Sequence, residues 1–273
     1  MYLEHWNLNL PPFENVPSPA FFYPSPMHDE ALERMSYTVF QGKGTAMISG
    51  EVGCGKTTLG RILMERLSKK RYQVVDMSNP ALGPVEFIQM IMELFQVPYD
   101  EGFSKAKMWQ ALEKKLMQNL SEGKGSVLII DEAQVVINQE TLEELRMLQN
   151  LQFDDKFLVN VILLGQIELE QEIKKCSPLD QRISIRYRLI PLPLTDAIKY
   201  IKHRLLLAGC KNIPFTKRAV QAIFGYTKGI PRQINNLCDR SLLAGYLADK
   251  ELVTKGIVEA AWEDLCCNPT SAG

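Results

Sequence analysis

The chain has 273 residues, enough to bury the core of one large domain or of two modest ones. Its 31 Lys and Arg residues nearly balance 32 Asp and Glu residues, and this formal net charge of −1 argues against a nucleic-acid or membrane partner attracted by bulk charge. No stretch approaches the roughly 20 apolar residues of a membrane-spanning helix, so we expect no direct membrane insertion. The six cysteines show no paired spacing, which favours reduced thiols in the cytoplasm.

Residues 1–27 are rich in aromatic side chains and prolines, a composition typical of irregular chain that is packed rather than solvated. We expect this segment to lie across the body of the domain. From 28 to 41 apolar residues recur at helical spacing, and Gly42 and Gly44 predict the end of that helix. Residues 1–44 are therefore expected to form an N-terminal segment and helix.

The stretch from 45 to 67 combines a short apolar strand, a glycine-rich loop and a helix with apolar residues at helical spacing. The loop fits the phosphate-binding pattern G-x-x-x-x-G-K-[ST] through Gly50, Glu51, Val52, Gly53, Cys54, Gly55, Lys56 and Thr57, followed by Thr58. Its glycines let backbone N–H groups turn toward phosphate oxygens, and the following helix adds its positive dipole end. We expect Lys56 to reach the β- and γ-phosphates of ATP and the Thr57 hydroxyl to bind Mg²⁺.

Further apolar runs alternate with helical patterns along the chain. Strands are predicted at 72–77, 127–130, 157–164 and 183–189, and helices at 84–95, 105–120 and 142–151. The run at 127–130 is fully apolar, as in a central strand of a parallel sheet. Strands that alternate with helices predict an α/β fold, with a parallel sheet flanked by helices.

Two carboxylates, Asp131 and Glu132, directly follow the apolar run at 127–130. Open parallel sheets bind ligands at the carboxyl ends of their strands, so we expect this pair to lie beside the P-loop. Asp131 is expected to hold the Mg²⁺ shell, and Glu132 to polarise the water that attacks the γ-phosphate. An acidic helix start after a strand is the alternative interpretation.

After a double proline at 191–193 the pattern changes, and only helices are predicted, at 195–208, 216–226, 231–247 and 254–266. The prolines are the expected boundary between an α/β nucleotide-binding core at 45–192 and a small helical lid at 193–267. A tail at 268–273 completes the chain.

A P-loop, an apolar strand that ends in Asp-Glu and a helical lid together resemble an AAA+ ATPase. More narrowly, the chain resembles the ExeA/GspA family, the ATPases of type II secretion and related pilus systems. The resemblance runs nearly from end to end and is carried by Tyr2, Leu8, Pro12, Phe13 and residues 21–23, 28–32, 50–58, 131–134, 179–183, 229–235 and 237–238. The same fold is similar to transposition ATPases of the TnsC and MuB kind, which bind DNA.

The resemblance implies roles for three further residues. Gln166 follows the predicted strand that ends at 164 and would be the polar sensor of the γ-phosphate, although many relatives use Asn, Ser or Thr one or two places earlier. Arg232 stands at the first turn of a lid helix and matches the second sensor, whose guanidinium suits phosphate oxygens. Arg182 precedes the last strand and matches the arginine finger that enters the neighbouring subunit's site, with Arg186 and Arg188 as rivals.

Together these features imply a cytoplasmic Mg-ATP-dependent AAA+ ATPase that hydrolyses ATP between subunits of a ring or filament. The resemblance implies that hydrolysis drives assembly of a secretion or pilus machine, with a membrane-associated partner that recruits the protein. An ATP-switched DNA-binding regulator is the alternative, and a basic stripe along a ring channel would favour it. A third interpretation is an NTPase that acts on a small adaptor protein. Secretion-type family members often continue into a membrane helix and a peptidoglycan-binding domain, whereas this sequence stops at Gly273, as a short relative or a truncated piece would.

Overall fold

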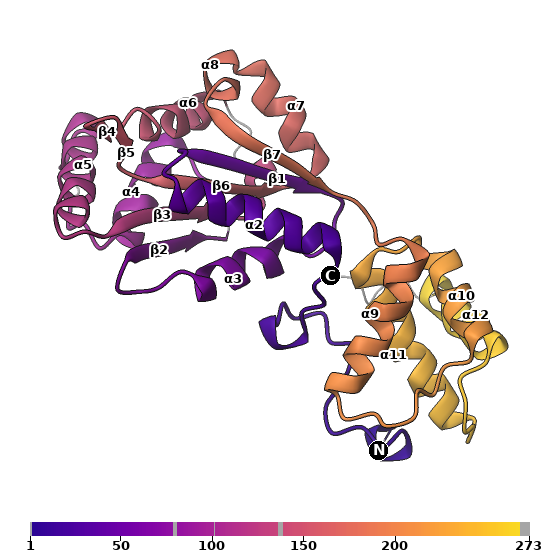
Figure 1. The fold of residues 1–273 in the computed structure, drawn as a ribbon. Helices are drawn as coiled ribbons and strands as arrows, with labels where there is room; N and C mark the ends of the chain where they lie inside the picture. The colour runs from indigo at the N-terminus through magenta and orange to yellow at the C-terminus, as the bar shows by residue number, and fades with distance from the viewer. Residues whose placement is uncertain (1, 79–80, 101, 136–138, 268–273) are drawn as a thin grey trace. The chain divides into compact units, whose positions relative to one another are not determined.

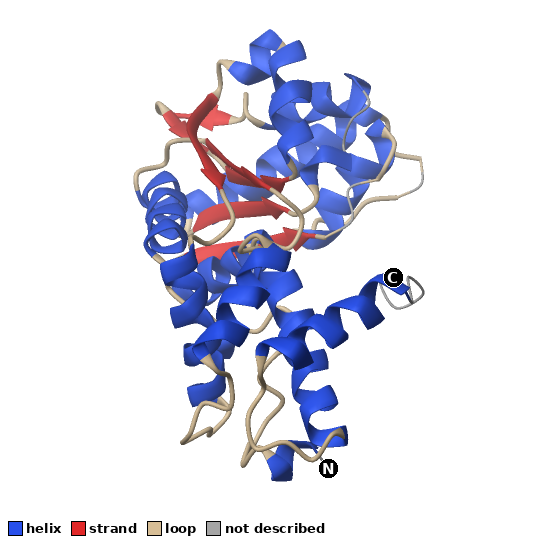
Figure 2. Cartoon of the chain, turned by 90° about the vertical axis from the view of Figure 1, so that its right-hand side faces the viewer, coloured by secondary structure: helices blue, strands red, loops and turns tan. Residues whose placement is uncertain are grey.

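The computed structural model describes residues 2–78, 81–100, 102–135 and 139–267, and the expected tail at 268–273 lies outside them. Contacts within the chain divide it into two units. The sheet unit comprises Pro26–Val52 and Lys56–Leu189, and the helical unit comprises the described parts of Met1–Ser25, Gly53–Gly55 and Ile190–Gly273. The described strands all belong to the sheet unit (Figure 2).

A five-stranded parallel sheet forms the centre of the sheet unit (Figure 1). Its spatial order is β2-β3-β6-β1-β7, with β1 Thr45–Gly50, β2 Tyr72–Met77, β3 Gly125–Ile130, β6 Asn160–Gly165 and β7 Ile183–Leu189. The three inner strands are almost wholly buried, which explains why their sequences are nearly continuous apolar runs. The edge strand β7 alternates apolar and polar residues and is only partly buried. The predicted α/β class is confirmed.

The strand register places the end of β3 beside the last residues of β6 and β1. Met47 of β1 pairs with Leu163 of β6, and Leu163 pairs with Ile130 of β3. β3 ends at Ile130, while β6 continues to Gly165 and β1 to Gly50. In a parallel sheet the carboxyl ends of all strands face the same edge, so the loops that follow them leave the sheet there. The P-loop and the two stretches that follow Ile130 and Gly165 therefore leave the sheet together.

Helices cover both faces of the sheet (Figure 1). One face carries α2 Pro26–Phe40 and α3 Lys56–Arg66, where Gly60 lies against the side chains of Leu164 and Ile129. The other face carries the hydrophobic core of the sheet unit. This core lies under α4 Pro84–Leu94, α5 Lys105–Ser121, α6 Gln139–Leu148, α7 Ile167–Lys175 and α8 Ser177–Asp180. The sequence patterns did not predict α7, because its three Glu residues and two Lys residues leave few apolar positions to show a period.

The predicted strand at 157–164 is wrong at its start, because β6 begins at Asn160. The preceding residues form a small antiparallel hairpin of β4 Gln152–Phe153 and β5 Lys156–Phe157. Its turn residues, Asp154 and Asp155, have φ of +47° and +59°. Two consecutive left-handed residues match the twist of a tight hairpin, and Asp tolerates that conformation better than most residues.

The long helices described in the helical unit are α9 Leu194–Leu207, α10 Lys217–Thr227, α11 Pro231–Leu247 and α12 Lys255–Cys267. Short turns α1 Tyr2–His5 and η1 Pro19–Phe21 lie in the N-terminal segment. Trp6, Leu8 and Phe13 of this segment are buried in the core of the helical unit. The expected 1–44 segment thus falls in both units, with the described residues up to Ser25 in the helical unit and those from Pro26 in the sheet unit.

A buried arginine anchors the N-terminal segment. Arg204 of α9 donates from Nε to the backbone oxygen of Pro12 at 2.5 Å and from Nη2 to that of Glu14 at 3.0 Å. Its Nη1 donates to the Tyr200 hydroxyl at 2.9 Å, and the indole N–H of Trp6 donates to the Leu242 oxygen at 3.0 Å. Irregular chain stays ordered only when its backbone groups find partners, and Arg204 supplies two of them.

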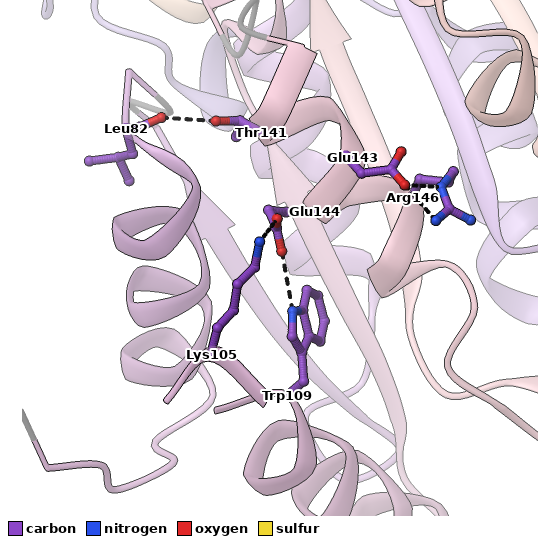
Figure 3. A network of polar contacts seen from close by, with 7 residues as sticks. All are labelled: Leu82, Lys105, Trp109, Thr141, Glu143, Glu144 and Arg146. Atoms are coloured by element: carbon purple, nitrogen blue, oxygen red, sulfur yellow. Dashed lines mark hydrogen bonds and ion pairs between the residues drawn. The ribbon is translucent and has the colours of Figure 1, made fainter. Parts of the chain in front are cut away.

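A buried carboxylate joins α6 to α5 within the sheet unit (Figure 3). The side chain of Glu144 is 2% exposed; it forms an ion pair with Lys105, whose side chain is 46% exposed, and accepts a hydrogen bond from the Trp109 indole at 3.2 Å. One turn earlier, the Thr141 hydroxyl donates to the Leu82 backbone oxygen at 3.2 Å. These contacts fix the helix that follows Asp131 and Glu132 in the chain.

We predict that Lys105→Met destabilises the fold by about 2 kcal/mol at neutral pH, because it leaves the buried Glu144 carboxylate without its cation. This loss is smaller than that expected for a fully buried ion pair, since Lys105 is half exposed. Glu144→Gln removes the buried charge and should destabilise the fold less. Urea denaturation followed by circular dichroism measures both variants and the double variant, which should resemble Glu144→Gln alone. Additive losses in the double variant would contradict this account.

Candidate functional site

The site predicted from the sequence lies at the carboxyl ends of β1, β3 and β6. β1 leads into the P-loop, β3 leads into Asp131 and Glu132, and β6 leads into Gln166, the residue before the first turn of α7. The register described above brings these three ends together although the residues are far apart in sequence.

Two glycines of the P-loop stand where the Cβ of any other residue would clash with neighbouring atoms. A Cβ on Gly50 would lie 2.7 Å from the backbone oxygen of Leu189, closer than two such atoms can approach. Gly53 has φ +84°, and within the helical unit a Cβ there would lie 2.6 Å from the Cβ of Arg232. A loop without side chains at these positions lets a phosphate group approach its backbone N–H groups.

The other loop residues differ in exposure. Glu51 and Val52 are exposed at the start of the loop, and Cys54 is buried. Gly55 has φ +95° and directly precedes α3, which begins at Lys56 and carries Thr57 and Thr58 in its first turn. The helix thus presents its N-terminus to the loop, where its dipole favours anions.

Lys56 lies folded over the loop and is 5% exposed. Its Nζ donates to the backbone oxygens of Gly50 at 2.9 Å and Glu51 at 3.0 Å. Both of these acceptors are neutral carbonyls, and ionised phosphate oxygens are stronger acceptors for an ammonium. The position of Lys56 therefore suits a triphosphate bound in the loop.

A hydrogen bond ties the P-loop helix to β3. The Thr57 Oγ1 donates to Asp131 Oδ2 at 2.6 Å, and Asp131 Oδ1 accepts the backbone N–H of Glu132 at 2.9 Å. Burial raises the pKa of the Asp131 carboxyl above its ordinary value, and the negative charges of Glu132 and Asp76 add to this, while the two hydrogen bonds oppose it. A cation beside Asp131 would favour its charged form.

The same two oxygens fit a magnesium ion. Hydroxyl and carboxylate oxygens are hard ligands, and Mg²⁺ is commonly held by one or two protein oxygens together with substrate phosphates and water. Among the residues that the structure describes, no group of three His, Cys, Asp or Glu side chains is placed to hold a metal by itself. Thr57 and Asp131 supply two oxygen ligands, which suits an ion that is also bound by nucleotide phosphates.

Glu132 is held by two glutamine amides. Its φ of +51° lies in the left-handed region, which is uncommon for a residue with a side chain. Gln134, in the short turn η2 Ala133–Val135, donates from Nε2 to Glu132 Oε2 at 2.5 Å, and Gln166 Nε2 donates to the same oxygen at 3.4 Å. The backbone N–H of Gln166 donates to Gln134 Oε1 at 2.9 Å. Sequence reasoning gave Gln134 no role, although its place just after the Asp-Glu pair was a usable signal.

Three arginines near β7 have different surroundings. Arg186 donates from Nη2 to the backbone oxygen of Asp180 at 2.7 Å and to its Oδ1 at 2.8 Å. Arg188 donates from Nε to Glu170 Oε1 at 2.8 Å and forms an ion pair with that carboxylate, which also accepts the Ser49 hydroxyl. Within the described parts of the chain, the side chain of Arg182 forms neither a hydrogen bond nor an ion pair.

Arg232 belongs to the helical unit and stands in the first turn of α11, with an exposed side chain. Its backbone N–H donates to the Gly53 oxygen at 3.2 Å. No hydrogen bond or ion pair of its guanidinium occurs among the described residues. The group is therefore available for an anionic ligand.

The described helices include none that is long and apolar enough to cross a membrane. A family model described as an AAA domain matches residues 39–173. The chain is 37% identical over 263 residues to general secretion pathway protein A of Aeromonas hydrophila, an alignment that covers 96% of this chain and 48% of that protein. The chain thus spans about half the length of this relative.

Two solved structures share the fold at low sequence identity. The ORC2 protein of Aeropyrum pernix matches with a TM-score of 0.67 and 16% identity, over 93% of this chain and 72% of that chain. Cdc6p of Pyrobaculum aerophilum matches with a TM-score of 0.68 and 15% identity, over 90% and 71% of the two chains. These two likenesses show the fold alone. The AAA-domain match and the 37% identity place the chain among the AAA+ P-loop ATPases, in the family of general secretion pathway protein A.

Proposed function

We propose that the protein binds Mg-ATP at the carboxyl edge of its sheet and hydrolyses it at interfaces between copies of itself, in a ring or filament. The hydrogen bond between Thr57 and Asp131 carries this proposal. It joins the P-loop to the strand end that bears Glu132, so that a phosphate cradle, two hard oxygen ligands and a candidate base lie together.

Each residue then has a defined task. Lys56 and the loop N–H groups hold the phosphates, and Thr57 and Asp131 hold Mg²⁺. When bound, Mg²⁺ neutralises negative charge on phosphate oxygens. Glu132 orients a water molecule and takes its proton, while Gln166 senses the γ-phosphate.

Two arginines complete the proposed site. A guanidinium without a partner among the described residues of its own chain can neutralise charge in a neighbouring copy, and Arg182 meets this condition where Arg186 and Arg188 do not. Arg182 is therefore the proposed finger. Arg232 is the proposed second sensor, because its guanidinium is exposed and the family resemblance gives it this role.

The relationship to general secretion pathway protein A supports a role for the ATP cycle in assembly of a secretion or pilus machine. In this proposal the protein works in the cytoplasm and a membrane-associated partner recruits it. Complementing a deletion strain with the wild-type gene or with Glu132→Gln tests this role, and unchanged secretion and piliation in the deletion strain would contradict it. The DNA-binding alternative predicts that duplex DNA stimulates hydrolysis, and the near-zero net charge does not favour it.

We predict that Lys56→Ala weakens ATP binding about 100-fold or more, since a charged hydrogen-bonded contact contributes about 3 kcal/mol. Titration with a fluorescent ATP analogue measures the affinity, and circular dichroism checks that the fold survives. Lys70→Ala, at an exposed lysine beyond the same helix, is the matched control and should bind normally. Wild-type affinity in Lys56→Ala would show that the loop does not hold the phosphates.

We predict that Glu132→Gln keeps ATP binding but lowers turnover by about 10²- to 10⁴-fold, because an amide of the same size cannot take a proton. The variant should accumulate as an ATP-bound oligomer, which light scattering detects. Glu140→Gln, at an exposed position of α6, should turn over at the wild-type rate. Undiminished hydrolysis in Glu132→Gln would remove Glu132 from the role of base.

We predict that Arg182→Ala binds ATP normally and hydrolyses it poorly, and that mixing it with Lys56→Ala restores activity. Mixed assemblies contain interfaces that pair an intact P-loop with an intact arginine. Activity should exceed that of either variant alone and should rise with protein concentration. Arg186→Ala and Arg188→Ala are controls, because arginines that brace their own chain should not be rescued by mixing. An unrescued mixture, with a wild-type rate per subunit that does not change on dilution, would exclude a shared site built on Arg182.

A further inference from the structure

Gln134 connects two strand ends through one side chain. Its Nε2 donates to Glu132 Oε2 at 2.5 Å beyond β3, and its Oε1 accepts the backbone N–H of Gln166 at 2.9 Å beyond β6. The residue is 8% exposed. A primary amide donates from its nitrogen and accepts at its oxygen, so one glutamine side chain can make both contacts.

The surroundings leave room for this amide and little else. A Cβ on Gly165 would lie 3.1 Å from Gln134 Oε1 and 2.6 Å from Leu169 Cδ2. The last residue of β6 therefore has no side chain where the Gln134 amide lies. Because Glu132 has left-handed backbone, its side chain also leaves the regular direction of the strand and depends on local contacts for its orientation.

The two amides act on one oxygen of the Glu132 carboxylate. Gln134 and Gln166 both donate to Oε2, and among the described residues Oε1 accepts no hydrogen bond. One oxygen is thus fixed by neutral donors, and the other is available to a water molecule. A carboxylate oriented in this way presents a defined lone pair to the proton that it takes.

We infer that Gln134 is a positioning residue for ATP hydrolysis, which orients Glu132 with Oε1 toward the attacking water and links that orientation to the backbone of Gln166. The inference rests on the proposed function, in which Glu132 takes the proton and Gln166 senses the γ-phosphate. Gln134 itself touches neither the nucleotide nor the water.

Two substitutions separate the contacts of Gln134. Gln134→Met has a similar size and loses both hydrogen bonds, and we expect single-turnover hydrolysis to fall about 10- to 100-fold with ATP affinity unchanged. Gln134→Glu keeps an acceptor for the Gln166 N–H but loses the donor to Glu132. Because its side chain is polar, it also serves as the test variant if Gln134→Met folds poorly. It should lose at least as much activity. Gln149→Met is the matched control, because this buried glutamine donates to the Thr45 hydroxyl and does not contact Glu132.

A double-variant cycle with Glu132→Gln distinguishes positioning from general structural support. In that background Gln134→Met should not slow the residual single-turnover rate further, whereas a loss of fold would slow it in both backgrounds. Full activity in Gln134→Met or Gln134→Glu, or equal losses in the two backgrounds, would overturn the inference. If Glu132→Gln itself hydrolyses ATP normally, the proposed role of Glu132 as the base is wrong. That result differs from the results that overturn only the role of Gln134.

Discussion

The parallel pairing of β3, β6 and β1 is the constraint on which the site depends. Ile130, Leu163 and Met47 lie side by side close to the carboxyl ends of their strands, so the loops that follow β3, β6 and β1 leave the sheet at the same edge. A slip of two residues in one pairing would keep the apolar faces inside but would shift a strand end by about 6.6 Å. The 2.6 Å hydrogen bond from Thr57 to Asp131 could not survive that shift. Burial of the central strands therefore holds both the fold and the relative positions of the catalytic candidates.

The sequence predicted those parts of the site whose signals are local. The P-loop has its own residue pattern, and Asp131 and Glu132 directly follow an apolar run, so their meeting follows from a parallel sheet. Gln134 could not be assigned in this way, because its role depends on the turn η2 and on a partner beyond another strand. The N-terminal aromatic residues signalled burial but not its place, since the groups that hold them, Arg204 and Leu242, are far away in sequence.

The three arginines show the same limit. Arg182, Arg186 and Arg188 are the same residue type in or directly before one strand, β7, and only their neighbours in space distinguish them. Arg186 pairs with Asp180 of α8, and Arg188 pairs with Glu170 of α7, two helices that the sequence patterns did not predict. Because ion pairs at half-exposed positions contribute little stability, these pairs matter here mainly as evidence of where each guanidinium points.

One short helix connects several parts of the site. α7 begins directly after Gln166, and one turn later Glu170 accepts the hydroxyl of Ser49, the residue before Gly50. The Arg188 guanidinium, with help from the Ser49 hydroxyl, lowers the pKa of the Glu170 carboxyl below its ordinary value. A lowered carboxyl pKa stabilises the fold above the ordinary pKa and loses that effect only as the pH falls through the lowered value. At neutral pH the ion pair between Glu170 and Arg188 is therefore fully charged. Because Glu170 also accepts the Ser49 hydroxyl, a displacement of the Gln166 end of α7 would be transmitted to β1, the strand that enters the P-loop.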